Sequence, residues 1–396
     1  MRKNNLFITS SCLLGALASC YGAFGKNPRP NVILILADDM GIGDVRGLNP
    51  DSQIDTPWLD EMCNRGIAFT DAHASSALST PSRYSILTGR YNWRSTKKGG
   101  VLGVMSPPMI ATGRNTIADM FRACDYTTAA IGKWHLGWDW TYKEGKAKTV
   151  DNIDFTKRVA NGPTDRGFDY FYGLTSPSGP PHLYMVNDMA EKQPNTRFEE
   201  SGGGLYKIKG GIGHSDWSAD GMQPHLADKM LEYLDENKDS DKPFFLYMAL
   251  TAPHIPLFPS KEFKGKSKIG DYGDLVMMID DIVGRVNRKL KEIGKYDNTI
   301  VMFAADNGCA GYINMDRINR KGHYPSYIYR GYKSHGWEGG HRIPFILSWG
   351  DRYGHVTDNS LVSLTDLYAT FADMLGYRMA DDEAEDSFSF WPILDG

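Results

Sequence analysis

Asn31-Val-Ile-Leu-Ile-Leu-Ala37, followed at once by Asp38-Asp39, is the stretch of this chain that most strongly indicates its architecture. It is a continuous apolar run of strand length, and a strand that is apolar on both faces belongs in a sheet covered by helices on both sides. Similar apolar runs occur at Thr127–Ile131, Phe244–Leu250, Thr299–Ala304 and Phe345–Ser348. We therefore expect a central sheet built from these segments.

Amphipathic helical patterns lie between the apolar runs. The longest, Asp274–Ile293, places Leu275, Met278 and Ile282 on one face. The others are Thr56–Arg65, Thr116–Ala123, His225–Asn237 and Leu361–Leu375. The alternation of strand and helix predicts an α/β fold with a mostly parallel central sheet flanked by helices on both faces. In such sheets a ligand binds outside the carboxyl ends of the strands.

The composition is that of a globular protein, with 41% apolar and 23% charged residues among 396. This length is sufficient for a large hydrophobic core. The net charge of −4 and the lack of a strongly basic block argue against nucleic-acid binding. The segment 138–221 is rich in Gly, Pro, Asn and Asp, and it breaks the strand–helix rhythm. We expect it to form long loops over one end of the sheet that serve as substrate walls.

The first 24 residues are predicted to be a signal peptide. Arg2 and Lys3 give a positive start, and an apolar stretch follows that is too short to span a membrane. Cys20 follows Leu17-Ala18-Ser19 in a pattern that resembles a bacterial lipoprotein cleavage site and would carry a lipid anchor. Simple cleavage near Gly22 to Phe24 is the alternative. Both imply an exported bacterial protein, periplasmic or anchored to the outer membrane.

The three cysteines outside this leader are Cys63, Cys124 and Cys309. An odd number argues against a full disulfide framework. Cys63 and Cys124 lie in apolar, helix-like stretches, so we expect both to be buried free thiols.

Acidic residues directly follow two of the predicted strands. Asp38 and Asp39 follow the first strand, and Asp306-Asn307-Gly308 follows Thr299–Ala304. Neighbouring side chains in an extended strand point to opposite faces, so both aspartates share one site only if the backbone turns there. Three carboxylates and one amide are oxygen ligands that suit Ca²⁺ or Mg²⁺ better than zinc.

Ser79-Thr80-Pro81-Ser82-Arg83 predicts the start of a short helix. Thr80 suits the N-cap, Pro81 the first helical position, and Gly89 the position just past the end. Ser79 then lies at the helix N-terminus, where free N–H groups and the helix dipole favour an anion, and Arg83 adds a cation one turn along. This favours attack on a sulfate or phosphate ester, with an ordinary capped surface helix as the alternative.

Three further motifs place basic side chains after predicted strands or in loops. Lys133 and His135 lie in Gly-Lys-Trp-His-Leu-Gly, and an extended backbone would direct both to one side for anion binding and proton transfer. His254 is bracketed by Pro253 and Pro256, and Lys333 precedes a Glu-Gly-Gly-His-Arg motif. A solvated lysine beside a packed histidine is the alternative for the first motif. Glu338 and Arg342 are expected to form a structural pair.

These motifs occur in the order found in the formylglycine-dependent (type I) sulfatases, and the chain resembles the arylsulfatase-like branch of the alkaline phosphatase superfamily from about residue 29 to 396. The resemblance implies that Ser79, the serine-type variant, is oxidised to formylglycine by a maturation enzyme. It implies a metal site of Asp38, Asp39, Ser79, Asp306 and Asn307, holding Ca²⁺ with Mg²⁺ as the alternative. The implied catalytic residues are Ser79, Arg83, Lys133, His135, His254 and Lys333.

The resemblance also implies a mechanism. Hydrated formylglycine attacks sulfur, with Asp306 accepting its proton and the basic residues offsetting the charge on the sulfuryl oxygens. His254 protonates the departing alcohol, and His135 takes the proton that allows sulfate to leave. The implied substrate is a sulfated sugar such as a galactose, N-acetylgalactosamine or glucosamine unit, consistent with glycan degradation.

Other activities remain open on the sequence. A phosphate or phosphonate monoester hydrolase of the same superfamily would use Ser79 directly on phosphorus. A non-catalytic glycan-binding relative would keep Ser79 unmodified, and a choline- or lipid-headgroup hydrolase would need an aromatic cage. Residues 25–396 are expected to form the catalytic domain. In the family, a sequence motif similar to the one that ends at Gly396 is followed by a subdomain with a small sheet. This subdomain is expected to be truncated here.

Overall fold

The computed structural model describes residues 29–396, and the predicted signal peptide and Cys20 lie outside them. Its centre is a ten-stranded sheet in the order β13-β2-β12-β11-β1-β10-β4-β5-β6-β7. β1 (Asn31–Ala37) lies between β10 (Phe244–Ala249) and β11 (Thr299–Ala305) and is parallel to both. β4 (Thr127–Lys133) continues the parallel region beside β10. All four strands are mostly apolar and almost entirely buried, as the sequence predicts.

The remaining strands are shorter. They are β2 (Ile67–Phe69), β3 (Ala72–His73), β5 (Tyr170–Leu174), β6 (Met185–Val186), β7 (Met189–Ala190), β8 (Thr196–Phe198), β9 (Gly211–Gly213), β12 (Phe345–Trp349), β13 (Val356–Asp358) and β14 (Val362–Ser363). The α-helices are α1 (Pro57–Arg65), α2 (Ser79–Thr88), α3 (Ile117–Ala123), α4 (Met222–Glu236), α5 (Asp271–Glu292), α6 (Met315–Asn319), α7 (Glu338–His341), α8 (Leu367–Leu375) and α9 (Trp391–Asp395).

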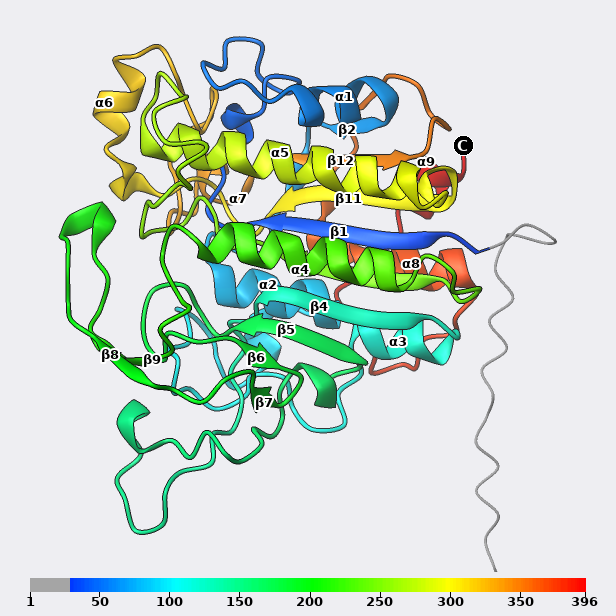
Figure 1. The fold of residues 1–396 in the computed structure, drawn as a ribbon. Helices are drawn as coiled ribbons and strands as arrows, with labels where there is room; N and C mark the ends of the chain where they lie inside the picture. Colours follow the sequence, from blue (N-terminus) through cyan, green and yellow to red (C-terminus); the bar gives the residue numbers. More distant parts are fainter. Residues whose placement is uncertain (1–28) are drawn as a thin grey trace, which may run out of the picture.

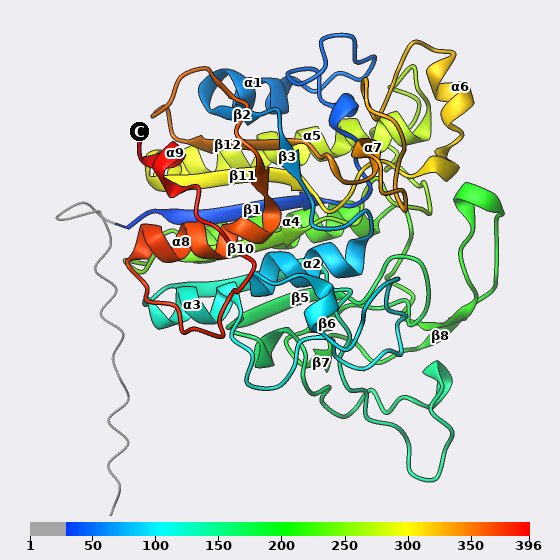
Figure 2. The same cartoon turned by 180° about the vertical axis from the view of Figure 1, so that it is seen from behind.

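Helices cover both faces of the sheet. α4 and α5 lie across the face toward the viewer in Figure 1, and α2, α3 and α8 lie across the opposite face in Figure 2. α5 buries Leu275, Met278 and Ile282, which belong to its predicted apolar face. The predicted α/β architecture with two helical layers is confirmed. Within residues 29–396, no helix is both long and apolar enough to cross a membrane.

Two parts of the sheet differ from the simple pattern. β12 runs antiparallel to β11, although its sequence is apolar like that of the parallel strands. β5, β6 and β7 extend the sheet beyond β4, so part of the segment 138–221 belongs to the sheet rather than to loops. The loop that carries β8 and β9 projects beyond the sheet in Figure 1. Periodicity cannot report strand direction, which depends on how the chain returns to the sheet.

The cysteine predictions have mixed outcomes. Cys63 and Cys309 are buried free thiols, and burial raises the pKa of Cys63 to about 12. Cys124 is buried as expected, but it is disulfide-bonded, so the prediction of a free thiol there is wrong. An apolar helical pattern predicts burial and carries no information about disulfide bonding.

Asp280 supplies a pH-dependent contact between two helices. Its carboxylate on α5 accepts hydrogen bonds from the backbone N–H groups of Trp58 (3.0 Å) and Leu59 (2.8 Å) at the start of α1. Burial raises the pKa of Asp280 to about 7, because those two bonds only partly offset its desolvation. The folded protein therefore holds a proton that the unfolded chain releases at a lower pH.

The variant Asp280→Asn is expected to remove this pH dependence. The wild-type contribution is fully present below the unfolded pKa of about 3.9 and is lost as pH rises through the folded pKa, because ionisation is then costly only in the folded state. From pH 4 to pH 8, the free energy of unfolding of wild type should fall relative to the variant by about 2–4 kcal/mol. Urea unfolding at several pH values measures this difference, and a constant difference would refute the assignment.

Candidate active site

The predicted site residues converge at the carboxyl ends of the central strands, the end on the left in Figure 1. Asp38 and Asp39 follow β1, Lys133 ends β4, and His254 follows β10. Further members come from the loop after β11, the N-terminal half of α2 and the loop before α7; they are Asp306, Asn307, Ser79, Arg83 and Lys333. Every sequence-predicted residue is present in this cluster or directly beside it.

The acidic group is buried and tightly connected. Asp38, Asp39, Asp306 and Asn307 are each no more than 1% exposed. Asn307 Nδ2 donates to Asp39 Oδ1 over 2.8 Å, and the Asp39 backbone N–H donates to Asp306 Oδ1 over 3.2 Å. The predicted backbone turn is made by Asp39 itself, which has φ of +67°. This left-handed conformation lets consecutive carboxylates join one site.

Ser79 is the first residue of α2 and lies against this group. Its Oγ is 3.2 Å from Asp38 Oδ1 and 3.4 Å from Asn307 Oδ1. The predicted N-cap is wrong: the helix begins at Ser79 with Leu78 as N-cap, because the Thr80 hydroxyl binds the His135 carbonyl and the Leu102 N–H instead. The predicted C-terminus is confirmed by Gly89, whose φ is +62°. The serine still lies at the positive end of the helix dipole.

Three basic side chains surround the carboxylates. Arg83 binds Asp306 Oδ2 through Nε (2.9 Å) and Nη2 (2.8 Å). Lys133 Nζ lies 2.7 Å from Asp38 Oδ2, and Lys333 Nζ lies 2.7 Å from Asp39 Oδ2. Burial opposes ionisation of Asp38, but Lys133, His254 and Arg83 together hold its pKa below the usual value. The Asp38 carboxylate is therefore ionised and available as an oxygen ligand at neutral pH.

His135 lies beside these residues, and its two ring nitrogens are in different environments. Its Nε2 binds the Leu102 carbonyl oxygen over 2.9 Å, so Nε2 carries the hydrogen and Nδ1 is a bare acceptor. Nδ1 is buried and has no hydrogen-bond partner among the described residues. Burial, with Lys133 and Arg83 nearby, lowers the pKa of His135 well below 6.5. The expected extended backbone is wrong here, because His135 has φ of +55°.

In His254 the other ring nitrogen, Nδ1, is the one engaged by a backbone carbonyl oxygen. Its Nδ1 donates to the Ile255 carbonyl oxygen over 2.6 Å, while Nε2 lies 3.7 Å from Asp39 Oδ2. Burial lowers the pKa of His254, although the carboxylates of Asp38 and Asp39 favour its protonated form. Nδ1 is therefore occupied, and Nε2 is the ring nitrogen that lies toward the acidic cluster.

Tyr312 is a site residue that the sequence reasoning missed. Its hydroxyl donates to Asp39 Oδ2 over 2.8 Å, and Lys333 Nζ lies 5.9 Å from the centre of its ring. The residue is 43% exposed and therefore forms an outer wall of the site. No motif surrounds it in the sequence, so only its place in the folded loop reveals the contact.

Four histidines outside the cluster have structural partners. His182 packs against Trp217 with ring centres 4.3 Å apart, and His323 Nε2 is 2.8 Å from Asp44 Oδ1. His214 lies 3.6 Å from Asp216, and His335 packs on Tyr332. The predicted structural pair of Glu338 and Arg342 is confirmed, at 2.6 Å.

The oxygen-rich cluster fits a hard divalent cation. The amide nitrogen of Asn307 is committed to Asp39 Oδ1 and the Gly308 carbonyl, so its amide oxygen is the atom turned toward Ser79. Three carboxylates and this amide oxygen form the donor set that such cations prefer. With three carboxylates balanced by Arg83, Lys133 and Lys333, a divalent cation would leave a positive site for a tetrahedral anion.

Comparison with known proteins gives concordant matches. Residues 30–377 match the family described as Sulfatase. The chain is 32% identical over 399 residues to an N-acetylgalactosamine-6-O-sulfatase of Bacteroides thetaiotaomicron, covering 92% of this chain and 76% of that protein. It is 30% identical over 397 residues to an N-acetylgalactosamine-6-sulfatase of Sus scrofa, covering 96% and 69%. A solved Bacteroides thetaiotaomicron structure, described under the metabolism of multiple glycosaminoglycans, matches with a TM-score of 0.79 at 30% identity, covering 93% and 82%.

Proposed function

The chain belongs to the sulfatase family and is a sulfate ester hydrolase, and on that premise we propose that it removes the 6-O-sulfate of an N-acetylgalactosamine unit. The observation that carries the proposal is the position of Ser79 Oγ between Asp38 and Asn307, inside a ring of three buried or half-buried cations. The names of the bacterial and porcine relatives support the choice of sugar and of ring position.

The proposed nucleophile is formylglycine, formed when a maturation enzyme removes two hydrogen atoms from the Ser79 side chain. Its hydrated form supplies a hydroxyl for attack on sulfur and a second hydroxyl whose deprotonation expels sulfate. The location of Ser79 at the start of α2, against Asp38, supports this assignment.

The proposed metal is Ca²⁺, with Mg²⁺ as the alternative, held by Asp38, Asp39, Asp306 and Asn307 together with the side chain at position 79. When bound it would lower the energy of the negatively charged sulfuryl oxygens. Arg83, Lys133 and Lys333 lie in the same cluster and add fixed positive charge without any reorganisation.

Proton transfer is assigned to the two histidines. His254 Nε2 lies beside the acidic cluster and would give its proton to the departing sugar hydroxyl. His135 offers a bare Nδ1 and stays neutral because of its lowered pKa, which suits a general base for the final release of sulfate. Asp306 is a secondary proton acceptor, although Arg83 and the Asp39 N–H already engage its oxygens.

Sulfate release from a panel of sugars tests the proposal. The panel consists of N-acetylgalactosamine 6-sulfate, N-acetylgalactosamine 4-sulfate and N-acetylglucosamine 6-sulfate, each with protein produced beside a maturation enzyme and supplied with calcium. We expect the first sugar to have the highest kcat/KM. Faster release from the 4-sulfate would overturn the assigned position, and no release from any sugar would remove the proposed substrate class.

The variant His254→Ala is expected to separate sugar substrates from aryl ones. A sugar alcohol is a poor leaving group that needs the proton, so kcat/KM should fall about 10²–10⁴-fold. An aryl sulfate with an acidic phenol should lose much less, because its oxygen departs as the anion. Parallel assays of both substrates measure the contrast. Equal losses would show that His254 is not the general acid.

We also propose that the protein is exported, as a periplasmic protein or a lipoprotein of the outer membrane. The positive start at Arg2 and Lys3 and the apolar stretch that follows support this. Labelling of the bacterium with a fatty acid distinguishes the two forms. Label that is lost in Cys20→Ala supports the anchor, whereas an unlabelled protein that starts near Gly22 to Phe24 supports simple cleavage.

A further inference from the structure

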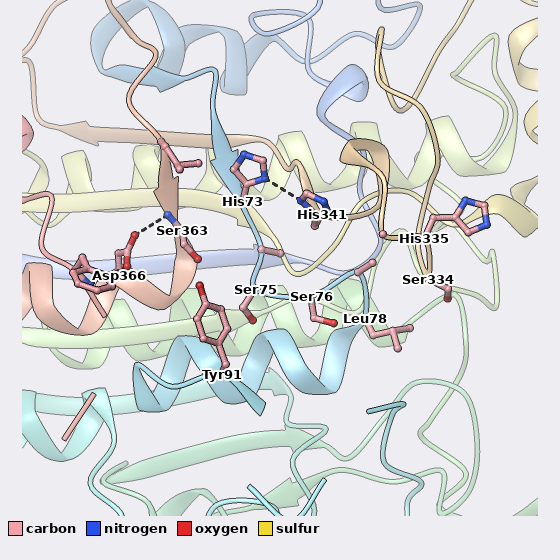
Figure 3. A pocket seen from close by; sticks show the side chains of 15 residues that line it. His73, Ser75, Ser76, Leu78, Tyr91, Ser334, His335, His341, Ser363 and Asp366 are labelled. Atoms are coloured by element: carbon pink, nitrogen blue, oxygen red, sulfur yellow. Dashed lines mark hydrogen bonds between the residues drawn. The ribbon is translucent and has the colours of Figure 1, made fainter. Parts of the chain in front are cut away.

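A second cluster of ligating side chains lines a cavity of about 730 Å³ on the α2 face of the sheet (Figure 3). His73 from β3 and His341 from α7 form part of its wall, together with Ser75, Ser363 and Asp366. In Figure 3 the two imidazoles point toward one another across this wall. None of the roles assigned above uses either histidine.

The Nδ1 atoms of the two rings face each other. His73 Nδ1 and His341 Nδ1 are 2.9 Å apart. His73 Nε2 lies 2.8 Å from Asp71 Oδ1, so that nitrogen carries the hydrogen and Nδ1 keeps its lone pair. The His341 ring also hydrogen-bonds to the backbone of Gly336, and since Nδ1 faces His73, this bond falls to Nε2. With the ring hydrogens on the outer nitrogens, the two Nδ1 lone pairs face each other, and a cation between them would relieve their repulsion.

Glu338 completes a three-residue group. Ligand atoms of His73, Glu338 and His341 all lie within 4.8 Å of one another. Arg342 binds both Asp71 Oδ1 (2.7 Å) and Glu338 Oε2 (2.6 Å). One cation therefore faces two carboxylates, and the cluster keeps one unit of negative charge when its histidines are neutral.

We propose that His73 Nδ1, His341 Nδ1 and a Glu338 carboxylate oxygen bind one Zn²⁺ ion, with the fourth position open to the cavity. Two imidazoles and a carboxylate are a familiar zinc donor set, and a carboxylate behind a ligating histidine, as Asp71 is here, fixes the ring and increases its basicity. Tetrahedral zinc with bonds of about 2.0–2.1 Å needs the nitrogens about 3.3 Å apart. The rings would have to separate slightly, and the Glu338 oxygen would have to approach them from within 4.8 Å.

This ion would connect two segments that lead to the active site. β3 precedes the stretch that enters α2 at Ser79, and α7 follows the loop that carries Lys333. The segments already meet through the Ser334 N–H, which donates to the Ala77 carbonyl oxygen over 2.9 Å. Zinc would add a further bridge to the backbone hydrogen bonds that already join them. The site differs in chemistry from the all-oxygen cluster, which prefers a harder cation.

Zinc titration of the whole protein in excess Ca²⁺ tests the proposal. Calorimetry at pH 7.5 is expected to show one Zn²⁺ per chain, with affinity reduced at least tenfold in His73→Ala and in His341→Ala. His214→Ala, which removes a histidine outside the cluster, should bind like wild type. The melting temperature of wild type should rise with Zn²⁺, and those of the two cluster variants should not.

X-ray absorption at the zinc edge keeps the test decisive if a variant fails to fold. In wild type it should report two imidazole nitrogens and at least one oxygen. A spectrum without imidazole ligands would overturn the proposal. So would equal zinc affinity in wild type and a folded His341→Ala variant, or no binding to wild type at 100 μM zinc.

Discussion

Replacing Ser79 by alanine is expected to reduce sulfate release to background, a loss of about 10⁴-fold or more, because no nucleophile remains at the acidic cluster. The fold should be kept. Among the described residues, the Ser79 hydroxyl hydrogen-bonds only to Asp38 and Asn307, and each of these has other hydrogen-bond partners. Initial rates on a sugar sulfate, with circular dichroism of the same sample, measure both parts of this prediction.

Ser85→Ala is the matched control for that variant. Ser85 lies on the same helix, is buried, and donates to the Pro81 carbonyl oxygen over 3.1 Å without touching the acidic cluster. It should retain activity within a few-fold of wild type. Activity of Ser79→Ala near that of the control would refute the assignment of the nucleophile.

Replacing Arg83 by methionine is expected to destabilise the folded protein by about 3–5 kcal/mol, because it leaves the Asp306 carboxylate buried without its partner. Both residues are 0% exposed, so water cannot replace the lost cation. Urea unfolding of wild type and variant, each in EDTA so that no divalent cation replaces Arg83 beside Asp306, gives the change in the free energy of unfolding. Sulfate release should also fall to near background.

A double variant separates the ion pair from simple loss of packing. Arg83→Met combined with Asp306→Asn should recover part of the lost stability, because no unpaired charge remains. Lys333→Met is the comparison at the rim of the acidic cluster. Because 13% of the Lys333 side chain is exposed, this variant should lose less stability than Arg83→Met. If the free energy of unfolding of Arg83→Met differs from that of wild type by less than about 1 kcal/mol, the ion pair does not hold the cluster together.

Much of the fold and site could be predicted because the deciding residues are adjacent in sequence. The run Asn31–Ala37 predicts a doubly covered strand, and Asp38 and Asp39 follow it directly. The short motifs around Ser79 and Lys133 are likewise local in sequence, and the resemblance to sulfatases supplied their expected roles. The contacts between these motifs, such as the ion pair of Arg83 and Asp306, could not be predicted from the sequence. They form only because the order of the strands in the sheet brings distant motifs together.

The features that were missed depend on contacts across the chain. Tyr312 reaches Asp39 from a loop 273 residues away in sequence, and no pattern marks it. Thr80 has the chemistry of an N-cap, but tertiary partners claim its hydroxyl and the helix starts at Ser79. His73 and His341 are isolated in sequence and meet only because β3 lies beside the loop that carries α7.

The mass of the peptide spanning Ser79, taken from a preparation that releases sulfate, tests the central claim most directly. The proposed conversion of serine to formylglycine predicts a peptide lighter by two hydrogen atoms, with activity that rises in proportion to the converted fraction. Full turnover of a sulfate ester by protein whose Ser79 is entirely unmodified would contradict it.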